Sequence, residues 1–232
     1  MNVRHLHDWQ VTYEEARTIQ KDLRRSLILH DDGIPHDIRL IAGADISYTR
    51  GDNLFYAAVV VLTLPGLELV EETSHAERVT FPYIPGLLSF REGPVLLRAF
   101  EQLQSRPDVA IFDGQGLAHP RQFGLACHMG LFLDIPTIGC AKTRLTGRSD
   151  HEPGLRPGDY THLLLDDAVI GAVVRTKKGV KPVYVSQGHR IGLKRSVEIV
   201  CASCRGYRLP EPTRQAHLAV NRIRKAATPT TD

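Results

Sequence analysis

Three acidic side chains stand where apolar segments of the chain give way to polar ones. Asp45 and Asp113 each follow directly on an apolar run, and Glu92 lies in the mixed segment 87–93. An ionised carboxylate at the edge of an apolar core costs free energy unless a lysine, an arginine or a metal ion lies against it. Hard divalent cations such as Mg²⁺ bind a few carboxylates together with water and substrate phosphate oxygens. These residues therefore predict a metal-dependent phosphoryl-transfer centre, with unrelated turn residues and surface salt bridges as the alternative.

Two further side chains can complete such a centre. Lys142 directly follows the predicted strand 136–141, where its charge can neutralise a phosphate. His217 lies on the last predicted helix and can serve as a metal ligand or a proton shuttle. The alternative for His217 is a packing or surface residue.

The segment Phe81–Gly86 is the second notable feature. Pro82 and Pro85 enclose Tyr83 and Ile84, which makes a stiff apolar segment that is neither helix nor central strand. Stiff apolar wedges are used by proteins to unstack bases and open duplexes. The alternative is a rigid turn packed on the core.

Glycines cluster after Asp113. Gly114, Gly116 and Gly124 allow the backbone to approach a ligand closely, and the helix expected next favours anions at its N-terminus. The segment is not a dinucleotide fingerprint, because the GxGxxG pattern is absent. A simple turn between a strand and a helix is the alternative.

The composition limits the class of protein. Of the 232 residues, 42% are hydrophobic and 24% are charged, which is typical of a soluble globular protein, and no apolar run reaches the length of a membrane span. The first eight residues lack the apolar core of a signal peptide. We therefore expect a cytoplasmic protein without membrane segments.

Charge and cysteines add two indications. The net charge is only +3, but from Gly171 onward there are 13 Lys and Arg against 3 Asp and Glu. This asymmetry suggests an anionic partner such as nucleic acid, with a solvated basic surface as the alternative. Cys201 and Cys204 form a lone CxxC pair, which favours a buried apolar role over a zinc site because structural zinc needs four ligands.

The order of predicted elements indicates one α/β domain over residues 1–232. Thr12 and Glu15 form a capping box that begins the first helix. The later predictions are strands at 39–47, 54–64 and 67–73, a helix at 94–104, a strand ending at Asp113, a helix opened by Pro120, strands at 136–141, 169–176 and 182–186, an exposed loop at 148–157, a helix at 193–204, a last helix, and a frayed tail at 226–232. Three meandering strands followed by alternating helices and strands predict a mixed sheet with helices on both faces. Asp45 and Asp113 are then neighbours, as in the ribonuclease H-like arrangement.

Taken in order, these motifs make the chain resemble the endonuclease V family. The matching stretches are Ala42–Ser47, Phe81–Glu92, Asp113–Gly116 with His119–Arg121, Ile138–Lys142 and Gly188–Arg190. The most specific is the PYIP segment joined to the downstream Glu92. The resemblance extends from the first helix to His217.

The resemblance implies a ribonuclease H-like fold and an Mg²⁺-dependent DNA repair endonuclease, with Mn²⁺ as a substitute. Such an enzyme recognises hypoxanthine, the base of deoxyinosine, and nicks the second phosphodiester bond on its 3′ side, leaving 3′-hydroxyl and 5′-phosphate ends. By position, Asp45, Glu92 and Asp113 are the metal-binding and catalytic carboxylates, Lys142 is a helper near the scissile phosphate, and His217 occupies a place held by Asp or His. The implied strand-separating wedge is Pro82, Tyr83, Ile84 and Pro85, and the implied base pocket is Leu88, Gly116, His119, Gly124 and Leu145.

Several alternatives stay open at this point. The expected partner is deoxyinosine-containing DNA, bound by a monomer, with inosine-containing RNA as an alternative because no motif reports contacts to the 2′-hydroxyl. A junction-resolving nuclease of the same fold would cut without any lesion. A non-enzymatic nucleic-acid-binding module would bind in a salt-dependent way without turnover.

Overall fold

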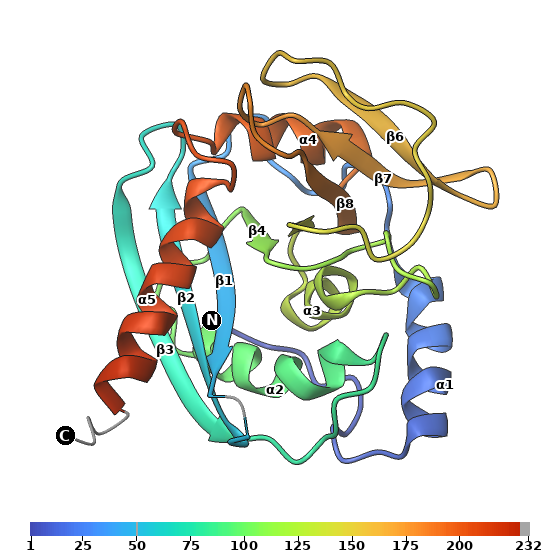
Figure 1. Ribbon diagram of the computed structural model, residues 1–232. Coiled ribbons are helices and arrows are strands. Elements are labelled where there is room, and N and C mark those ends of the chain that lie inside the picture. The colour runs from blue at the N-terminus through green and yellow to red at the C-terminus, as the bar shows by residue number, and fades with distance from the viewer. Residues whose placement is uncertain (50, 228–232) are drawn as a thin grey trace.

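The structure, a computed structural model, describes residues 1–49 and 51–227 and is built on one mixed sheet (Figure 1). The strand order is β3-β2-β1-β4-β5-β8-β7-β6, in which β1–β4 and β4–β5 are parallel and the other pairs are antiparallel. The strands are β1 (Leu40–Tyr48), β2 (Leu54–Thr63), β3 (Leu69–Arg78), β4 (Val109–Phe112), β5 (Thr137–Ala141), β6 (Tyr160–Leu165), β7 (Ala168–Val174) and β8 (Val183–His189). The meander of β3, β2 and β1 thus joins a short parallel centre.

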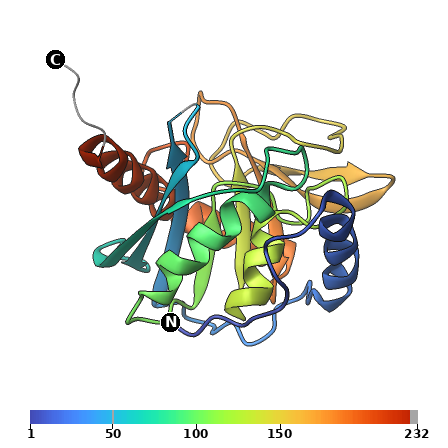
Figure 2. The ribbon, with the colours of Figure 1, turned by 90° about the horizontal axis from the view of Figure 1, so that it is seen from below.

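Helices cover both faces of this sheet. They are α1 (Tyr13–Leu23), continued by a 3₁₀ turn at Arg24–Ser26, α2 (Leu88–Glu101), α3 (Leu125–Leu133), α4 (Leu193–Ala202) and α5 (Glu211–Ala227). The buried side chains of α2 and α3 pack on one face, and those of α4 and α5 pack on the other. Figures 1 and 2 both place α1 and α5 at opposite sides of the molecule.

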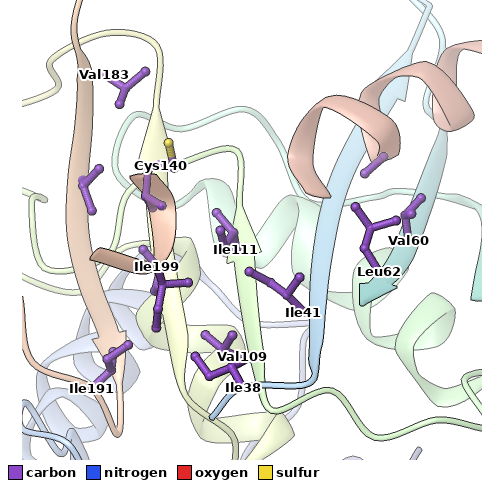
Figure 3. Close-up of a cluster of buried hydrophobic side chains, with 14 of the residues drawn as sticks. Ile38, Ile41, Val60, Leu62, Val109, Ile111, Cys140, Val183, Ile191 and Ile199 are labelled. Carbon is purple, nitrogen blue, oxygen red and sulfur yellow. The ribbon is translucent and has the colours of Figure 1, made fainter. Parts of the chain in front are cut away.

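The strands divide their side chains between two cores because successive residues point to opposite faces. In β1, Ile41 packs in the α4 and α5 core, whereas Ala42 and Ala44 pack in the α2 and α3 core. Figure 3 shows Ile41 beside Ile111 of the neighbouring strand, with Ile199 of α4 among the residues of the same core. The eight central residues of β2 are buried on both faces, which explains its continuous apolar run.

Most predicted elements are confirmed. The capping box of Thr12 and Glu15 is present at the start of α1, and every predicted strand exists with bounds shifted by a few residues. The predicted helix 193–204 ends at Ala202. Residues 226 and 227 of the predicted tail belong to α5, and 228–232 lie outside the described residues. Among the described helices, none combines the length and the apolar character required to cross a membrane.

Three predictions were wrong. The helix placed at 94–104 begins at Leu88, so that Pro94 lies inside it, because the buried Leu87 and Phe90 pack against Ala16 of α1. Pro120 does not open the next helix, which begins only at Leu125. Residues 117–122 instead form tight turns, with the His119 N–H donating to the Leu117 carbonyl. The strand β6 was missed because its polar sequence at the sheet edge lacks a clear apolar alternation.

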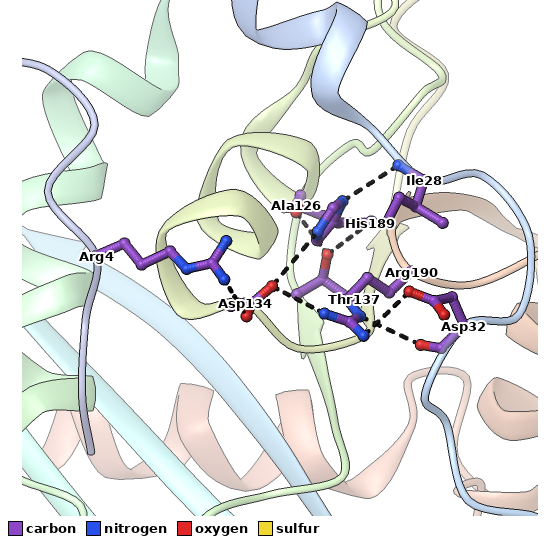
Figure 4. A network of polar contacts seen from close by, with 8 residues as sticks. All are labelled: Arg4, Ile28, Asp32, Ala126, Asp134, Thr137, His189 and Arg190. Carbon is purple, nitrogen blue, oxygen red and sulfur yellow. Dashed lines mark hydrogen bonds and ion pairs between the residues drawn. The ribbon is translucent and has the colours of Figure 1, made fainter.

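A polar network ties α3, β8 and the chain after α1 together (Figure 4). The Asp134 carboxylate accepts from Arg4 and, at 3.0 Å, from Arg190 Nη1, while Arg190 Nη2 lies 3.0 Å from the Asp32 carboxylate. Burial lowers the pKa of the adjacent His189 to about 4, so its ring is neutral. The stretch Gly188–Arg190, which matches the endonuclease V family, therefore has a role in stabilising the fold rather than in the predicted carboxylate site of Asp45, Glu92 and Asp113.

We expect Asp134→Asn to lower the free energy of unfolding by about 1–3 kcal/mol, because it removes one of the two carboxylates that contact the partly buried Arg190. Asparagine tolerates the left-handed backbone of position 134 (φ 52°), so loss of the charge is the main change. The matched control is Asp167→Asn, at another left-handed residue (φ 66°) whose ion pair with Arg148 is exposed. Denaturant unfolding should separate the two variants, and equal stabilities would contradict the role of the network.

Candidate active site

Asp45 and Asp113 are brought together by the parallel pairing of β1 with β4. Ala44 pairs with Phe112, and the two aspartates are the next residue on each strand. The Asp113 N–H lies 3.5 Å from the Ala44 carbonyl oxygen, which continues the ladder weakly by one step. The prediction that these residues are neighbours is confirmed.

Glu92 enters the same region from α2. Burial, and then the charges of Asp45 and Asp113, raise the pKa of Glu92 to about 8. Burial and the Asp113 charge likewise raise the pKa of Asp45, opposed by its hydrogen bond with His217. The three carboxylates therefore share one poorly solvated site, in which their negative charges repel each other.

Two cationic or protonatable side chains flank the carboxylates. Lys142, directly after β5, forms an ion pair with Asp113 through Nζ. Its backbone is held in place by Arg208 Nη2, which donates to the Lys142 carbonyl at 2.6 Å. On the other side, His217 of α5 lies with Nδ1 2.7 Å from Asp45 Oδ2, and its side chain is 49% exposed.

The position of His217 depends on how closely α5 approaches β1. Gly43 faces the start of α5, where a Cβ would overlap the backbone of Pro212, so only glycine permits this approach. One turn after His217, Asn221 accepts a hydrogen bond from Ser47 Oγ at 3.0 Å. Contacts on both sides of Asp45 thus fix the helix that carries His217.

The carboxylates fit a hard divalent cation by their chemistry, because their mutual repulsion leaves negative charge for a cation to neutralise. Within residues 1–49 and 51–227, however, no three acidic, histidine or cysteine side chains are grouped closely enough to hold a metal ion by themselves. Lys142 already contacts Asp113, and His217 already contacts Asp45. This open arrangement suits Mg²⁺, which keeps several waters and completes its coordination with substrate phosphate oxygens.

A cavity of about 130 Å³, here called the Leu88 cavity, lies at the start of α2. Four of the five residues predicted for the base pocket line it, namely Leu88, His119, Gly124 and Leu145, and so do Tyr83, Ile84 and Pro85 of the predicted wedge. Pro82 and Gly116 do not line it. Gly116 instead packs tightly against the Gln187 backbone, next to Gln115 of the cavity wall.

The helices α2 and α3 both begin at the Leu88 cavity. Leu88 and Leu125, their first residues, line it, and neither helix has a side-chain hydrogen bond at its N-cap. The first amides of a helix have no partner within the helix, and together they create a positive potential. The glycine-rich loop supplies fewer donors than expected, since the Gly116 N–H donates to Ser186 Oγ and the Gly124 N–H to the Gly116 carbonyl.

Three polar residues of the cavity wall were not predicted from the sequence: Gln20, Ser89 and Gln115. Gln20 is buried one turn after Ala16 on the apolar side of α1. A polar residue at an apolar position of a helix is a signal that the sequence itself contains. Gln115 is buried with Oε1 unpaired, and its Nε2 donates to the Thr143 carbonyl at 3.0 Å.

Ser89 belongs to a chain of hydrogen bonds that runs from the buried His128 to the exposed Asp8. Its Oγ lies 2.8 Å from His128 Nδ1, His128 Nε2 lies 2.7 Å from His7 Nε2, and His7 Nδ1 lies 2.8 Å from the Asp8 carbonyl oxygen. Burial lowers the pKa of both histidines, so both rings are neutral.

The predicted wedge has an exposed tip on a fixed base. Tyr83 is 68% exposed, whereas Phe81 is buried and its carbonyl accepts from Arg91 at 2.7 Å. At the other end, the Gly86 carbonyl accepts from Gln20 at 3.0 Å and from Arg121. The segment is therefore held at both ends with its tyrosine in solvent.

Comparison with known proteins decides the family. The endonuclease V sequence profile matches residues 21–218. The chain is 50% identical to endonuclease V of Gloeobacter violaceus over 226 residues, which are 97% of this chain and 91% of that protein. The chain belongs to the endonuclease V family.

Solved endonuclease V structures share the fold. The Streptomyces avermitilis structure superposes with a TM-score of 0.91 at 41% identity and covers 99% of this chain and 100% of its own. The Ciona intestinalis enzyme, in complex with a 23-mer DNA containing an inosine followed by a ribo-adenosine, has a TM-score of 0.83 at 26% identity, covering 94% of this chain and 100% of its own. The ribonuclease H-like fold is confirmed.

Membership of the endonuclease V family makes this chain a DNA-cleaving nuclease of a metal-dependent family. The alternative of a non-enzymatic binding module is therefore wrong. The profile match spans all five predicted catalytic positions, from Asp45 to His217. Their individual roles, and those of the wedge and pocket residues, stay predictions.

The CxxC pair has a structural role outside this endonuclease V site. Cys204 Sγ donates to the Val200 carbonyl at 3.2 Å, and burial raises the pKa of its thiol to about 12. Cys201 packs against the α4 and α5 core. Neither thiol is grouped with metal-binding partners among the described residues.

We expect Glu92→Gln to stabilise the metal-free protein at pH 8 by about 1–3 kcal/mol relative to wild type. The raised pKa of Glu92 means that its contribution to stability is present below the ordinary pKa of 4.5 and is lost as the pH rises toward 8. Thermal unfolding with EDTA from pH 5 to pH 8 should therefore show a steeper loss for wild type. Adding Mg²⁺ at pH 8 should raise the Tm of wild type more than that of the variant.

The control is Glu198→Gln, at an exposed residue of α4 that pairs only with neighbouring Arg195 among the contacts described. Its pH profile should follow that of wild type. Parallel profiles for wild type and Glu92→Gln would contradict the electrostatic coupling at the site.

Proposed function

We propose that this protein is an Mg²⁺-dependent endonuclease that recognises hypoxanthine in DNA and starts its repair. It hydrolyses the second phosphodiester bond 3′ to the lesion and leaves 3′-hydroxyl and 5′-phosphate ends. The observation that carries the proposal is that residues of the PYIP segment line a small cavity at the start of α2, the helix that also carries Glu92, in a chain of the endonuclease V family. In support, the Ciona intestinalis relative was crystallised with inosine-containing DNA.

The Leu88 cavity suits hypoxanthine better than adenine. Hypoxanthine has a carbonyl where adenine has an amino group. The Leu88 and Leu125 amides, the first of α2 and α3, are donors for a carbonyl oxygen, whereas the Ala126 N–H already donates to the Gln115 carbonyl. Adenine would place its own amino donor against these amides. A buried unpaired donor costs about 1–3 kcal/mol, which corresponds to roughly 5- to 150-fold in affinity. A mispaired lesion base also costs less to flip out of the helix.

Asp45, Glu92 and Asp113 are the residues that would hold the divalent cation, Mg²⁺ or in its place Mn²⁺. When bound, such a cation polarises the phosphate and lowers the pKa of the attacking water. Lys142, beside Asp113, stabilises negative charge that develops on the scissile phosphate. With Nδ1–H of His217 donated to Asp45, Nε2 is the remaining ring nitrogen, and it lies 3.2 Å from Asn221 Nδ2. It can take a proton from water when water replaces the Asn221 amide as its hydrogen-bond partner.

The wedge residues Pro82, Tyr83, Ile84 and Pro85 fill the gap left by the displaced base. The rigid base of the segment limits the entropy lost when Tyr83 inserts between bases. We infer that the protein acts as a monomer in the cytoplasm.

A second candidate is an inosine-specific endoribonuclease. It is favoured by one observation: the DNA bound by the Ciona intestinalis enzymes carries a ribo-adenosine after the inosine. A nicking assay on inosine-containing RNA and DNA separates the two candidates, because an endoribonuclease would cut the RNA in preference to the DNA. A lesion-independent junction nuclease would cut four-way junctions that lack inosine.

We expect the wild-type protein to nick an inosine-containing duplex in Mg²⁺ and to leave a matched adenosine duplex intact. Asp45→Ala and Asp113→Asn should lower single-turnover nicking by at least about 10³-fold, because cation binding is worth several kcal/mol in the transition state. Binding of the duplex should stay measurable in both variants. The control Asp167→Asn changes an exposed aspartate and should nick normally.

Full activity in either active-site variant would remove the carboxylate centre from the proposal. Nicking that is equal in both duplexes, or absent with and without Mg²⁺, would count against the lesion-directed function.

We expect Tyr83→Ala to reduce nicking of duplex substrate by about tenfold or more and to affect single-stranded substrate much less. The reason is that unstacking a base step costs a few kcal/mol, which only a duplex requires the wedge to offset. Tyr160→Ala, at another exposed tyrosine, is the control. Equal losses on the two substrates would argue against strand separation by this segment.

A further inference from the structure

The exposed side of α1 carries a basic groove, here called the α1 groove, with a volume of about 710 Å³. Its basic lining residues are Arg17, Lys21, Arg24, Arg25 and Arg121, and Glu14 is the acidic one. Among the described residues, these side chains form two ion pairs, Arg17 with Glu14 (3.8 Å) and Arg25 with Asp22 (3.5 Å), both long and between exposed side chains. Such pairs contribute little, so the groove keeps a positive potential.

The α1 groove and the Leu88 cavity share a wall. Arg121 lines the groove, and its Nε donates to Gln20 Oε1 at 2.6 Å. Gln20 lines the cavity, and both residues donate to the Gly86 carbonyl at the end of the wedge. Burial and the nearby Arg17 charge lower the pKa of Arg121. Cations that lie this close repel each other, and a bound anion would reduce that repulsion.

The α1 groove lies on the side of the cavity away from His217. Gln20 belongs to α1 and His217 to α5, and these helices stand at opposite sides of the molecule in Figures 1 and 2. The proposed cut lies 3′ to the lesion, so the strand leaves the cavity toward the carboxylates in the 3′ direction. Its 5′ part must then leave on the α1 side.

The spacing of the charges matches a phosphate backbone. Arg17 and Lys21 of α1 and Arg24 of the 3₁₀ turn that continues it follow each other at intervals of four and three residues, the spacing of neighbours on one helical face. At about 1.5 Å per residue they extend over about 10 Å, whereas phosphates of one strand recur about every 3.4 Å along the axis of a duplex. The face is therefore long enough to contact more than one phosphate.

We propose that the α1 groove binds the backbone phosphates of the DNA strand on the 5′ side of the flipped base. This inference rests on the proposed function, because it takes its direction from the position of the cut. It assigns to α1 a share of substrate binding that is separate from the catalytic carboxylates and from the wedge.

The test measures nicking and binding on single-stranded inosine substrates with a constant 3′ flank and a 5′ flank shortened stepwise to two nucleotides. For wild type, kcat/KM should fall about tenfold or more as the 5′ flank is removed. Arg17→Gln/Lys21→Gln should show this loss already on the long substrate and little further loss on the short one. Its slope of log affinity against log salt should be shallower by about 1.4, since each single-strand phosphate contact contributes about 0.7.

Two checks keep the result specific. Arg39→Gln/Lys194→Gln removes the same charge from exposed residues at the start of β1 and on α4, and should retain the wild-type response to the 5′ flank. Shortening the 3′ flank should affect all proteins equally. Glutamine is a good helix former, and Lys21→Glu alone provides a second variant if the double variant unfolds.

The proposal is overturned if the α1 variants respond to 5′ flank length as wild type does while inosine nicking is intact. In that case the proposed function stands and only the surface assignment falls. If wild type does not nick inosine substrates at all, the proposed function fails and this inference fails with it.

Discussion

The parallel pairing of β1 with β4 is the constraint on which the active site depends. It places Asp45 beside Asp113 at the point where both strands end their shared ladder. Lys142 pairs with Asp113, and His217 contacts Asp45. Burial, and then the charges of the two aspartates, raise the pKa of Glu92 to about 8. The fold thus concentrates negative charge at the centre of its sheet, where a divalent cation is the natural counterion.

Helix α2 connects this charge to the Leu88 cavity. Its first two residues line the cavity, and Glu92 follows Leu88 by four positions, one turn later on the same side of the helix. The contacts of Leu87 and Phe90 with α1 fix the start of the helix. The helix thereby sets the distance between the cavity and Glu92, which suits the proposed cleavage at a fixed number of bonds from a lesion.

The strand pattern and the acidic residues were predictable because they follow from local rules. Apolar runs that end in an aspartate predict buried strands with polar ends, and Asp45 and Asp113 obey this. The start of α2 was not predictable, because Pro94 favours a helix boundary and only the long-range contact with Ala16 overrides it. Gln20 could be recognised as an unusual polar residue but not assigned to the cavity, since that depends on α1 packing beside Gly86.

The series of hydrogen bonds from Asp8 to Ser89 determines which hydrogen bonds the Ser89 hydroxyl can offer to a ligand in the Leu88 cavity. A carbonyl oxygen can only accept, so the proton of neutral His7 is on Nδ1, and its Nε2 must receive one from His128. His128 then has only a lone pair on Nδ1, and the hydroxyl hydrogen of Ser89 is committed to it. The Ser89 hydroxyl is thereby an acceptor without a donor: it complements a ligand edge bearing N–H and opposes one bearing a bare ring nitrogen.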